Sequence, residues 1–272
     1  MSLTLTPLPG IPLIRPGDDL SSIILDALHA TRLTLHDNDV LVLAQKIVSK
    51  AEGRSVNLAT VTPSERALEL ADQTNKDARV VELILEESNA VLRTRPGLIV
   101  VEHKLGFVCA NAGIDHSNVS SDDFSRRESA TKVATTNSCV SDDWVLLLPE
   151  NPDASAADLR KRLEEETGAR VGVLIIDSHG RAWRMGTVGI SIGFSGLPGL
   201  ADLRGQPDLF GRTLERTQVG VVDELAAAAS LMMGQAAEGT PVVHVRGFPY
   251  PLRDADTGLR EMLRPKKEDL FR

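Results

Sequence analysis

The clearest pattern along the chain is a set of short runs that are almost entirely apolar. Val40–Ala44, Leu98–Val101, Val171–Ile176 and Pro241–Val245 all have this character. Runs of this length, bounded by polar or turn-forming residues, are typical of buried strands. We therefore expect these four segments to form core strands.

Between these runs, apolar residues recur at the spacing of an α-helix. The expected helices cover residues 20–28, 62 to about 73, 78–88, 153–168 and 222–233. Thr62-Pro63-Ser64-Glu65 reads as a capping box with proline at the first helical position. Gly168 and Gly234 are expected to end the last two helices. Because strands and helices mix without strict alternation, we expect an α+β or mixed α/β fold.

Two segments do not follow either pattern. Residues 120–143 are rich in Ser, Thr and Asp, and are predicted to be a polar insertion that is either a surface loop or a lid. Glycine recurs at Gly186, Gly189, Gly193, Gly196 and Gly199. So many glycines would weaken a helix, so we expect a tight backbone region with loops, with a subunit contact as the alternative.

Composition narrows the class of protein. The 272 residues allow one large domain or two modest ones. The net charge of −8 and the 3% aromatic content argue against nucleic-acid binding. Two cysteines and no signal-like N-terminus fit a cytoplasmic protein. The longest uncharged stretch, 185–201, is shorter than the roughly 20 apolar residues of a membrane span, so no membrane association is expected.

The candidate chemistry centres on two aspartates, each placed at the end of an apolar run. Asp115 follows Leu105–Gly113, and Asp177 follows Val171–Ile176. An aspartate in this position is more often a turn former than a ligand. Two of them could instead hold a hard divalent cation such as Mg²⁺ or Mn²⁺.

Two pairs of cationic residues follow expected strands. Arg181 and Arg184 follow Asp177 and suit recognition of a phosphate, with a structural salt bridge as the alternative. Lys46 and Lys50 follow the strand 40–44 and could neutralise a triphosphate, or could be solvated surface charges. No phosphate-binding glycine signature is present, so the motifs by themselves do not predict nucleotide binding.

Four motifs together resemble the coenzyme F420-0:L-glutamate ligase family, also called gamma-glutamyl ligases. They are Gly10-Ile11-Pro12-Leu13-Ile14, the segment from Gln45 to Arg54, the segment from Asn111 to Val119, and the segment from Asp177 to Arg184. The resemblance runs from about Leu8 to Gly247 and implies a two-lobed ligase fold over residues 1–272. It also implies an intertwined homodimer. We expect a stand-alone ligase, without the nitroreductase-like domain that follows in some relatives.

The resemblance implies roles for individual residues. Asp115 and Asp177 would share one divalent ion, and Ser178 would help to bind a second. Gln235 stands where the family often has a metal-binding glutamate, so the second ion would bind more weakly or Glu238 would contribute. Nucleotide contacts are implied for Ile11, Pro12, Leu13, Ile14, Gln45, Lys46, Lys50, Asn118, Met233, Gly234, Gln235, Ala236, Ala237, Glu238, Gly239 and Thr240.

The implied activity is GTP-dependent ligation of L-glutamate to coenzyme F420-0. An acyl phosphate would form first, and further gamma-linked glutamates would follow, with Arg181 and Arg184 as tentative catalytic residues. Two Mg²⁺ or Mn²⁺ ions would assist. The alternatives are a metal-dependent phosphatase or nucleotidase on the same aspartates, and a non-catalytic deazaflavin-binding protein, motivated by Gln235.

Overall fold

The computed structural model describes residues 2–116, 143–253 and 257–270. The chain forms two compact units. The first contains the N-terminal residues as far as Ile11, residues 20–44, and the chain from Asn151 onwards; the second contains residues 12–19 and 45–150. The predicted insertion, 120–143, falls almost entirely outside the described residues, as does Asn118.

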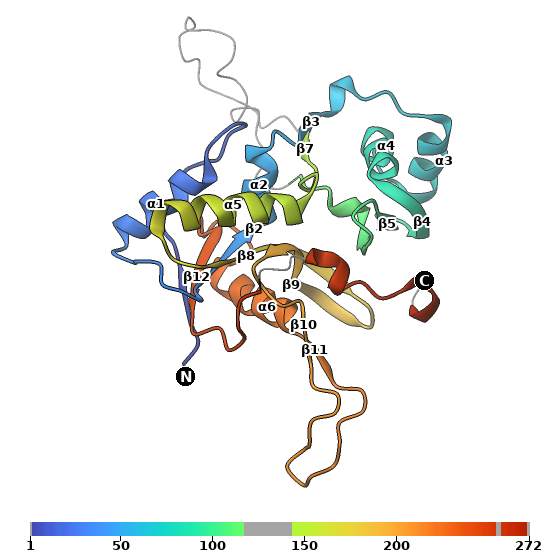
Figure 1. Cartoon of the computed structure of the whole chain (residues 1–272). Coiled ribbons are helices and arrows are strands. Elements are labelled where there is room, and N and C mark those ends of the chain that lie inside the picture. Colours follow the sequence, from blue (N-terminus) through green and yellow to red (C-terminus); the bar gives the residue numbers. More distant parts are fainter. Residues whose placement is uncertain (1, 117–142, 254–256, 271–272) are drawn as a thin grey trace, which may run out of the picture. The chain divides into compact units, whose positions relative to one another are not determined.

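A five-stranded mixed sheet forms the centre of the first unit (Figure 1). Its order is β1 (Thr4–Pro7), β12 (Val242–Arg246), β2 (Val40–Ala44), β8 (Gly172–Arg181) and β9 (Arg184–Ser195). β2 and β8 are parallel, and all the other neighbours are antiparallel. The last paired residues of the parallel strands are Ala44 and Ile176, so Gln45 and Asp177 each come directly after that pair.

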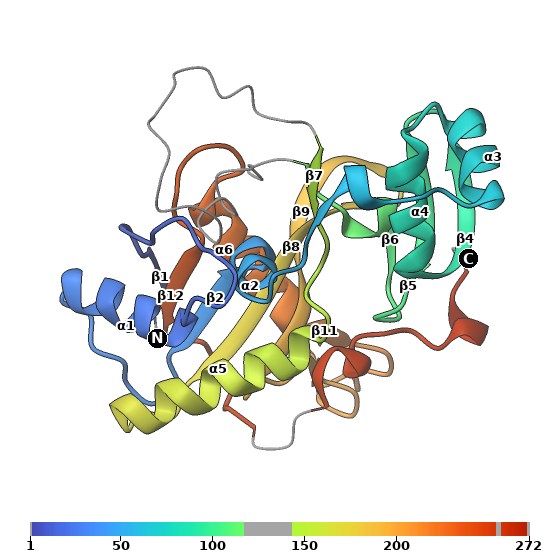
Figure 2. The same ribbon diagram turned by 90° about the horizontal axis from the view of Figure 1, so that it is seen from above.

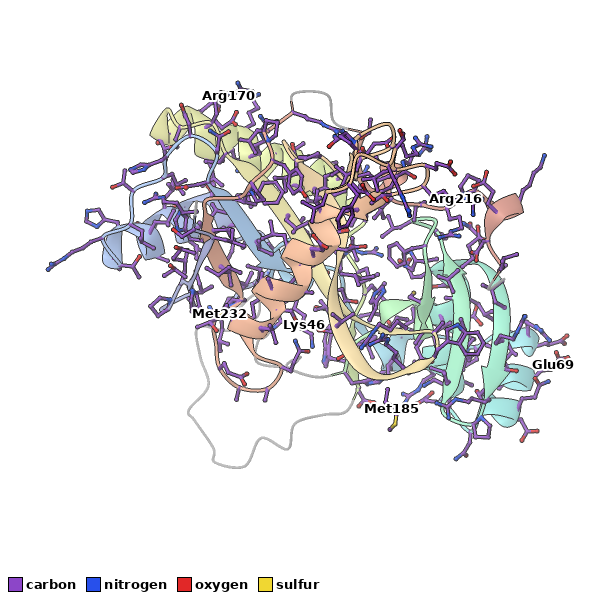
Figure 3. All side chains as sticks on the ribbon, turned by 90° about the horizontal axis from the view of Figure 1, so that it is seen from below. Lys46, Glu69, Arg170, Met185, Arg216 and Met232 are labelled. Atoms are coloured by element: carbon purple, nitrogen blue, oxygen red, sulfur yellow. The ribbon has the colours of Figure 1, made fainter. Side chains whose placement is uncertain are left out.

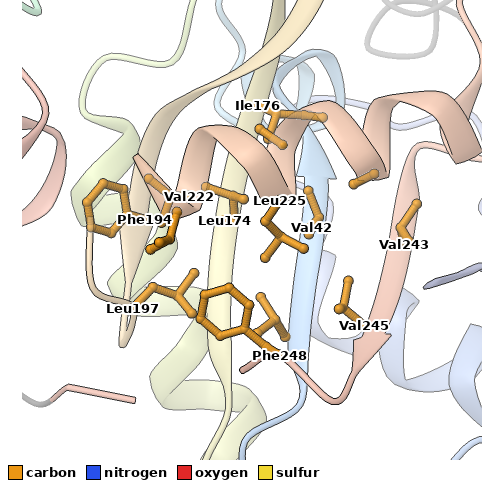
Figure 4. Close-up of a cluster of buried hydrophobic side chains, with 14 of the residues drawn as sticks. Val42, Leu174, Ile176, Phe194, Leu197, Val222, Leu225, Val243, Val245 and Phe248 are labelled. Carbon is orange, nitrogen blue, oxygen red and sulfur yellow. The ribbon is translucent and has the colours of Figure 1, made fainter. Parts of the chain in front are cut away.

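Helices cover both faces of this sheet (Figures 1 and 2). α6 (Val221–Met233) packs on one face, and α5 (Pro152–Thr167) packs on the other, with α1 (Leu20–Ala30) against α5. Alternate strand residues such as Val42, Leu174 and Val243 point towards α6 and form the core with Phe194 and Leu225 (Figure 4). The expected mixed α/β class is confirmed, because apolar runs of the predicted kind form this buried sheet.

β8 is longer than the sequence pattern indicated. The apolar run ends at Ile176, but the strand continues through Asp177 to Arg181, and a two-residue turn leads directly into β9. The expectation that Asp177 stands at the end of a strand is therefore wrong. Antiparallel pairing with β9 supplies the backbone hydrogen bonds of this polar half of the strand, so an apolar sequence is not required there.

The glycine-rich stretch is also mostly strand, which corrects the expectation of loops. β9 covers Arg184–Ser195, and a bulge leaves Ile192 without a register partner. A Cβ on Gly189 would lie 2.5 Å from Cβ of Ser230 in α6. A Cβ on Gly193 would lie 2.4 Å from Cβ of Pro152 in α5. The extra residue reverses the alternation, so the two glycines admit helices on opposite faces of the sheet.

A cluster of charged side chains lies at the start of β2, around the buried Asp39. Asp39 accepts hydrogen bonds from Nε and Nη2 of Arg246 at 3.0 and 2.6 Å, and its Oδ2 lies 2.8 Å from Nε2 of His244. The backbone N–H of His36 also donates to it at 2.9 Å. Burial alone would raise the pKa of Asp39, but these hydrogen bonds outweigh it and lower the pKa.

The second unit combines short helices with two small sheets. Its helices are α2 (Gln45–Ala51), α3 (Glu65–Thr74) and α4 (Ala78–Glu86). β3 (Ser55–Asn57) pairs with β7 (Trp144–Leu146), and β4 (Ser88–Arg95), β5 (Leu98–His103) and β6 (Val108–Ala110) form a meander. The predicted start of α3 is wrong by two residues: Ser64, not Thr62, is the N-cap, and its hydroxyl accepts from the N–H of Ala67.

The remaining elements are small. β10 (Leu200–Asp202) and β11 (Gln218–Gly220) form a two-stranded ribbon at the base of a long loop in the first unit. One-turn 3-10 helices cover Leu58–Thr60, Asn111–Gly113, Gly258–Glu261 and Lys266–Glu268. Within the described ranges, no helix combines the length and apolar character needed to cross a bilayer.

Candidate functional site

Asp115 lies directly after a tight left-handed turn in the second unit. Asn111, Ala112 and Gly113 all have positive φ, at 50°, 52° and 66°. Oδ1 of Asn111 accepts from the N–H of Ile99, and Asp115 forms a two-way backbone bridge with Leu146 at 3.0 and 2.9 Å. Hydrogen bonds before and after the turn thus stabilise a backbone conformation that non-glycine residues rarely adopt. They fix the backbone position from which the Asp115 side chain extends.

The first turn of α2 supplies the partners of that carboxylate. Nε2 of Gln45 donates to Oδ2 of Asp115 at 3.0 Å, and Nζ of Lys46 lies 3.3 Å from the same oxygen. The hydroxyl of Ser49 donates to Oε1 of Gln45 at 2.8 Å, which fixes the orientation of the amide. An anionic oxygen, an ammonium group and the start of a helix therefore meet within one unit.

Lys50 is on the same side of α2 as Lys46, one turn further along. Unlike most lysines its side chain is buried, with 7% exposure. The structure therefore argues against Lys50 being an ordinary solvated surface charge. Its contact with a nucleotide stays a prediction.

Asp177 occupies the polar half of β8 in the first unit. Its Oδ2 lies 2.9 Å from Nε2 of His179, two residues further along the same face of the strand. Both side chains are largely buried, at 12% and 8% exposure. The carboxylate is held by a regular strand and a neighbouring imidazole, so its position depends on the β8–β9 pairing.

Ser178 faces the opposite side of β8 and contacts the segment that follows α6. Its hydroxyl donates to Oε1 of Gln235 at 2.7 Å, and Nε2 of Gln235 donates to the hydroxyl of Ser230 at 2.9 Å. Both partners are hydroxyl groups, which can donate or accept, and the amide of Gln235 bridges them. The sequence-based pairing of Ser178 with Gln235 is thus a direct contact, and the carbonyl oxygen of Gln235 is the atom beside the serine.

Glu238 turns back onto its own loop. Its Oε2 accepts from the N–H of Ala236 at 2.8 Å, and this bond is the main reason that the pKa of Glu238 is lowered. A Cβ on Gly234 would lie 2.2 Å from Cδ of Glu238, a side chain that can move, but φ of +74° at Gly234 itself favours glycine. The hydroxyl of Thr240 donates to the carbonyl of Met233 at 3.1 Å and closes the loop.

Arg181 and Arg184 face each other across the base of the β8–β9 turn. Nη1 of Arg181 donates to the carbonyl oxygen of Gly186 at 3.1 Å, so part of its guanidinium braces the hairpin. Both side chains are exposed, as are Trp183 and Met185, and Met185 points away from the sheet (Figure 3). Their tentative catalytic role stays a prediction.

The N-terminal segment predicted to line a nucleotide is uneven in exposure. Ile14 is fully packed, with 2% exposure, whereas the side chain of Leu13 is 77% exposed. Pro12 is also exposed and Ile11 is half-buried. Leu13 and Pro12 are thus the members of this motif that present apolar surface.

The donor set fits a hard divalent cation in its chemistry. Asp115, Asp177, Ser178 and Gln235 offer carboxylate, hydroxyl and amide oxygens, the ligands that Mg²⁺ and Mn²⁺ prefer. Asp115 belongs to the second unit, and Asp177, Ser178 and Gln235 belong to the first. No group of three His, Cys, Asp or Glu side chains in the described part of the chain is placed to hold a metal ion.

Three supporting residues were not predicted as site members. Ser49 orients Gln45, Ser230 orients Gln235, and His179 contacts Asp177. The spacing of Gln45 and Ser49 by four residues on a helix was a usable signal. His179 stands two residues after Asp177, but its contact follows only once the segment is known to be a strand.

The sequence also has close relatives. Residues 10–247 match the family model described as F420-0:Gamma-glutamyl ligase. A protein named coenzyme F420:L-glutamate ligase from Methanothermobacter thermautotrophicus is 43% identical over 272 residues, which cover all of both chains. Proteins of the same name from Methanococcus maripaludis strain C7 and Methanopyrus kandleri are 44% and 42% identical, over 96% and 100% of this chain and 94% and 98% of theirs.

These matches extend over nearly the whole chain and include all four motifs from which the resemblance was first inferred. The segments that they cover hold Asp115 against Gln45 and Lys46 in one unit, and Ser178 against Gln235 in the other. The chain belongs to the F420-0:gamma-glutamyl ligase family.

Proposed function

We propose that this protein is a GTP-dependent ligase that joins L-glutamate to coenzyme F420-0. The observation that carries the proposal is the contact of Asp115 with Gln45 and Lys46 at the start of α2. A carboxylate, an amide and an ammonium at one point suit the handling of a charged phosphate chain. The names of the relatives supply the substrate class.

The chemistry begins with a carboxylate that does not react with amines at neutral pH. Transfer of the terminal phosphoryl group of GTP to an oxygen of the F420-0 carboxylate gives an acyl phosphate and GDP. The amino group of glutamate then attacks the acyl carbon, loses a proton, and expels inorganic phosphate. Repetition at the side-chain carboxyl of the added glutamate builds a gamma-linked tail.

The chain's own residues would bind and orient these anions. Lys46 and Lys50 project from one side of α2 and would offset the charge of the nucleotide phosphates. Asp115 in the second unit, and Asp177, Ser178 and Gln235 in the first, would each offer oxygen ligands to Mg²⁺ or Mn²⁺. When bound, such ions supply charge neutralisation where two anions approach one another.

Mass spectrometry of F420-0 incubated with the protein, L-glutamate, GTP and Mn²⁺ tests this proposal. Successive glutamyl mass additions that disappear without GTP or metal are the expected result. Hydrolysis of GTP without a glutamyl product would indicate a phosphatase instead. Binding of the deazaflavin without any reaction would indicate a carrier protein and would overturn the ligase assignment.

We also propose that the protein acts as a homodimer. The loop between β10 and β11 carries Leu209 and Phe210 near its tip, with 98% and 91% exposure. Adjacent apolar side chains this exposed are commonly covered by a partner. Light scattering should give twice the 29.3 kDa chain mass, and a monomer would refute the dimer.

A further inference from the structure

A cavity of about 350 Å³ lies in the second unit, apart from the Asp115 contacts described above. The connection between α3 and α4 forms one side of it, through Asn75, Lys76 and Asp77. Leu58 and Val80 form its apolar wall, and His116 lies at its edge. Its size is at the lower end of the roughly 300–1,000 Å³ that small-molecule sites occupy.

Lys76 is the unusual residue of this cavity. Its side chain is partly buried, and burial lowers the pKa of its ammonium group below the ordinary value for lysine. Nζ has only a long hydrogen bond, 3.4 Å, to the carbonyl oxygen of Gly97. Among the residues that the structure describes, Lys76 forms no ion pair. A partly desolvated cation without a carboxylate partner is an open position for an anion.

The neighbouring Asp77 does not fill that position. Its carboxylate accepts from the N–H, Nε and Nη2 of Arg79 at 2.9, 3.1 and 2.6 Å, and the pKa of Asp77 is lowered mainly by its hydrogen bond with Arg79. The cavity therefore contains one uncommitted cation, a carboxylate with a paired arginine, and the amide of Asn75. An amino acid with its own carboxylate and ammonium suits such mixed charge, and Leu58 and Val80 suit its methylene groups.

The cavity adjoins the candidate metal-binding carboxylate, Asp115, along the chain. His116, at its edge, directly follows Asp115, and both belong to the same unit. Resting on the function proposed above, we propose that this cavity binds the co-substrate L-glutamate, with a glutamate carboxylate on the ammonium of Lys76. A gamma-glutamyl tail carries the same carboxylate chemistry, so the experiment has to separate free glutamate from the tail.

The test compares Lys76→Met with Lys104→Met, a control that removes an exposed lysine between β5 and β6 of the same unit. Loss of a charge-assisted hydrogen bond should raise the KM for L-glutamate about tenfold to a hundredfold in Lys76→Met only. The kcat and the KM for GTP and F420-0 should stay unchanged. Lys76→Arg retains the charge and should recover part of the affinity. Thermal unfolding shows that each variant is folded.

Two results would overturn the inference. An unchanged KM for glutamate with fewer later additions would assign the cavity to the tail instead. An equal rise in KM in Lys104→Met would show a general charge effect.

Binding of ¹³C-labelled L-glutamate, followed by NMR, does not require turnover. Lys76-dependent binding in a protein that makes no glutamyl product would therefore refute the proposed ligase function while retaining this glutamate site. If the protein forms the glutamyl product and Lys76→Met has no effect, the glutamate site is refuted and the ligase function is retained.

Discussion

Asp39 and Asp115 are both contacted by cationic side chains, but the two carboxylates differ in how completely their partners enclose them. Asp39 is 3% exposed and has Arg246, His244 and a backbone N–H around it. Asp115 is 29% exposed, and Gln45 and Lys46 both approach its single oxygen Oδ2.

We expect this difference to separate a structural carboxylate, Asp39, from a candidate functional one, Asp115. A buried carboxylate must have its hydrogen bonds satisfied within the fold, because an unpaired buried charge is very costly. A partly exposed carboxylate can exchange partners with solvent or ligand at little cost in stability. Substitution should therefore affect mainly folding at Asp39 and mainly chemistry at Asp115.

The largest expected effect is on turnover. Asp115→Asn and Asp177→Asn should each lower kcat/KM for glutamyl addition at least about a thousandfold, equal to about 4 kcal/mol of transition-state stabilisation. The melting temperature of Asp115→Asn should change little. Product formation followed by mass spectrometry measures the first quantity and calorimetry the second. Full activity in both variants would remove the metal assignment.

Asp39→Ala should have the opposite signature. Removing one partner of a buried ion cluster costs about 3–5 kcal/mol of unfolding free energy, because Arg246 and His244 are left without their counter-charge. Urea denaturation measures this loss, with the exposed Asp26→Ala as the matched control. The turnover of the remaining folded molecules should equal that of the wild type, and a selective loss of kcat would contradict the structural role.

Acid should remove the contribution of Asp39. Its folded-state pKa is lowered below the ordinary value of 3.8, so the unfolded chain takes up the proton first as the pH falls. The stabilisation is complete above that value and is lost as the pH falls through the folded pKa. The stability difference between wild type and Asp39→Asn should therefore narrow below about pH 4. A gap that stays constant down to pH 2 would be inconsistent with this linkage.

A glycine beside Asp115 sharpens the comparison. Gly113 has φ +66°, and an added Cβ would lie 2.7 Å from Cδ1 of Leu148. Gly168 has φ +72°, but an added Cβ meets nothing within 4 Å. Gly113→Ala should cost about 1–3 kcal/mol and reduce activity, whereas Gly168→Ala should show only the backbone cost of about 1 kcal/mol. Equal losses in the two variants would mean that packing against Leu148 contributes nothing.

The smallest expected effect concerns Gln235. Gln235→Glu should lower the Mn²⁺ concentration for half-maximal activity about threefold to tenfold, because a charged ligand replaces a neutral one. The fold should accept it, since the hydroxyls of Ser178 and Ser230 can both donate to a carboxylate. Metal titration of the two proteins measures the shift, and a weaker metal response in the glutamate variant would oppose the assignment.

Much of the core could be predicted from the sequence. Val40–Ala44 is the strand that its apolar run predicts, and the helices ending at Gly168 and Gly234 end there in the structure. These elements are recognisable because burial alone dictates their composition. The family resemblance implies metal-binding roles for Asp115, Asp177, Ser178 and Gln235, which stay predictions; Ser178 does contact Gln235.

The remainder depended on tertiary pairing that no local pattern reveals. The sequence of the polar half of β8 is not typical of a strand. Backbone hydrogen bonds to β9 stabilise this half, and burial of apolar side chains does not. The sequence of β9 is not typical of a strand either, because its glycines make room for two helices that pack on opposite faces of the sheet. The left-handed turn before Asp115 contains two non-glycine residues, so only its third position gave any signal.

The bulge at Ile192 makes the spacing of β9 as constrained as its composition. Side chains before it, such as Ser191, bond with Asp223 of α6, while Gly193 after it faces α5. Deletion of Ile192 would remove no polar or charged group. It would nevertheless turn the side chains of half of the strand to the opposite face of the sheet. In a library of length variants, this fully buried position should therefore tolerate apolar side chains of similar size but no missing residue.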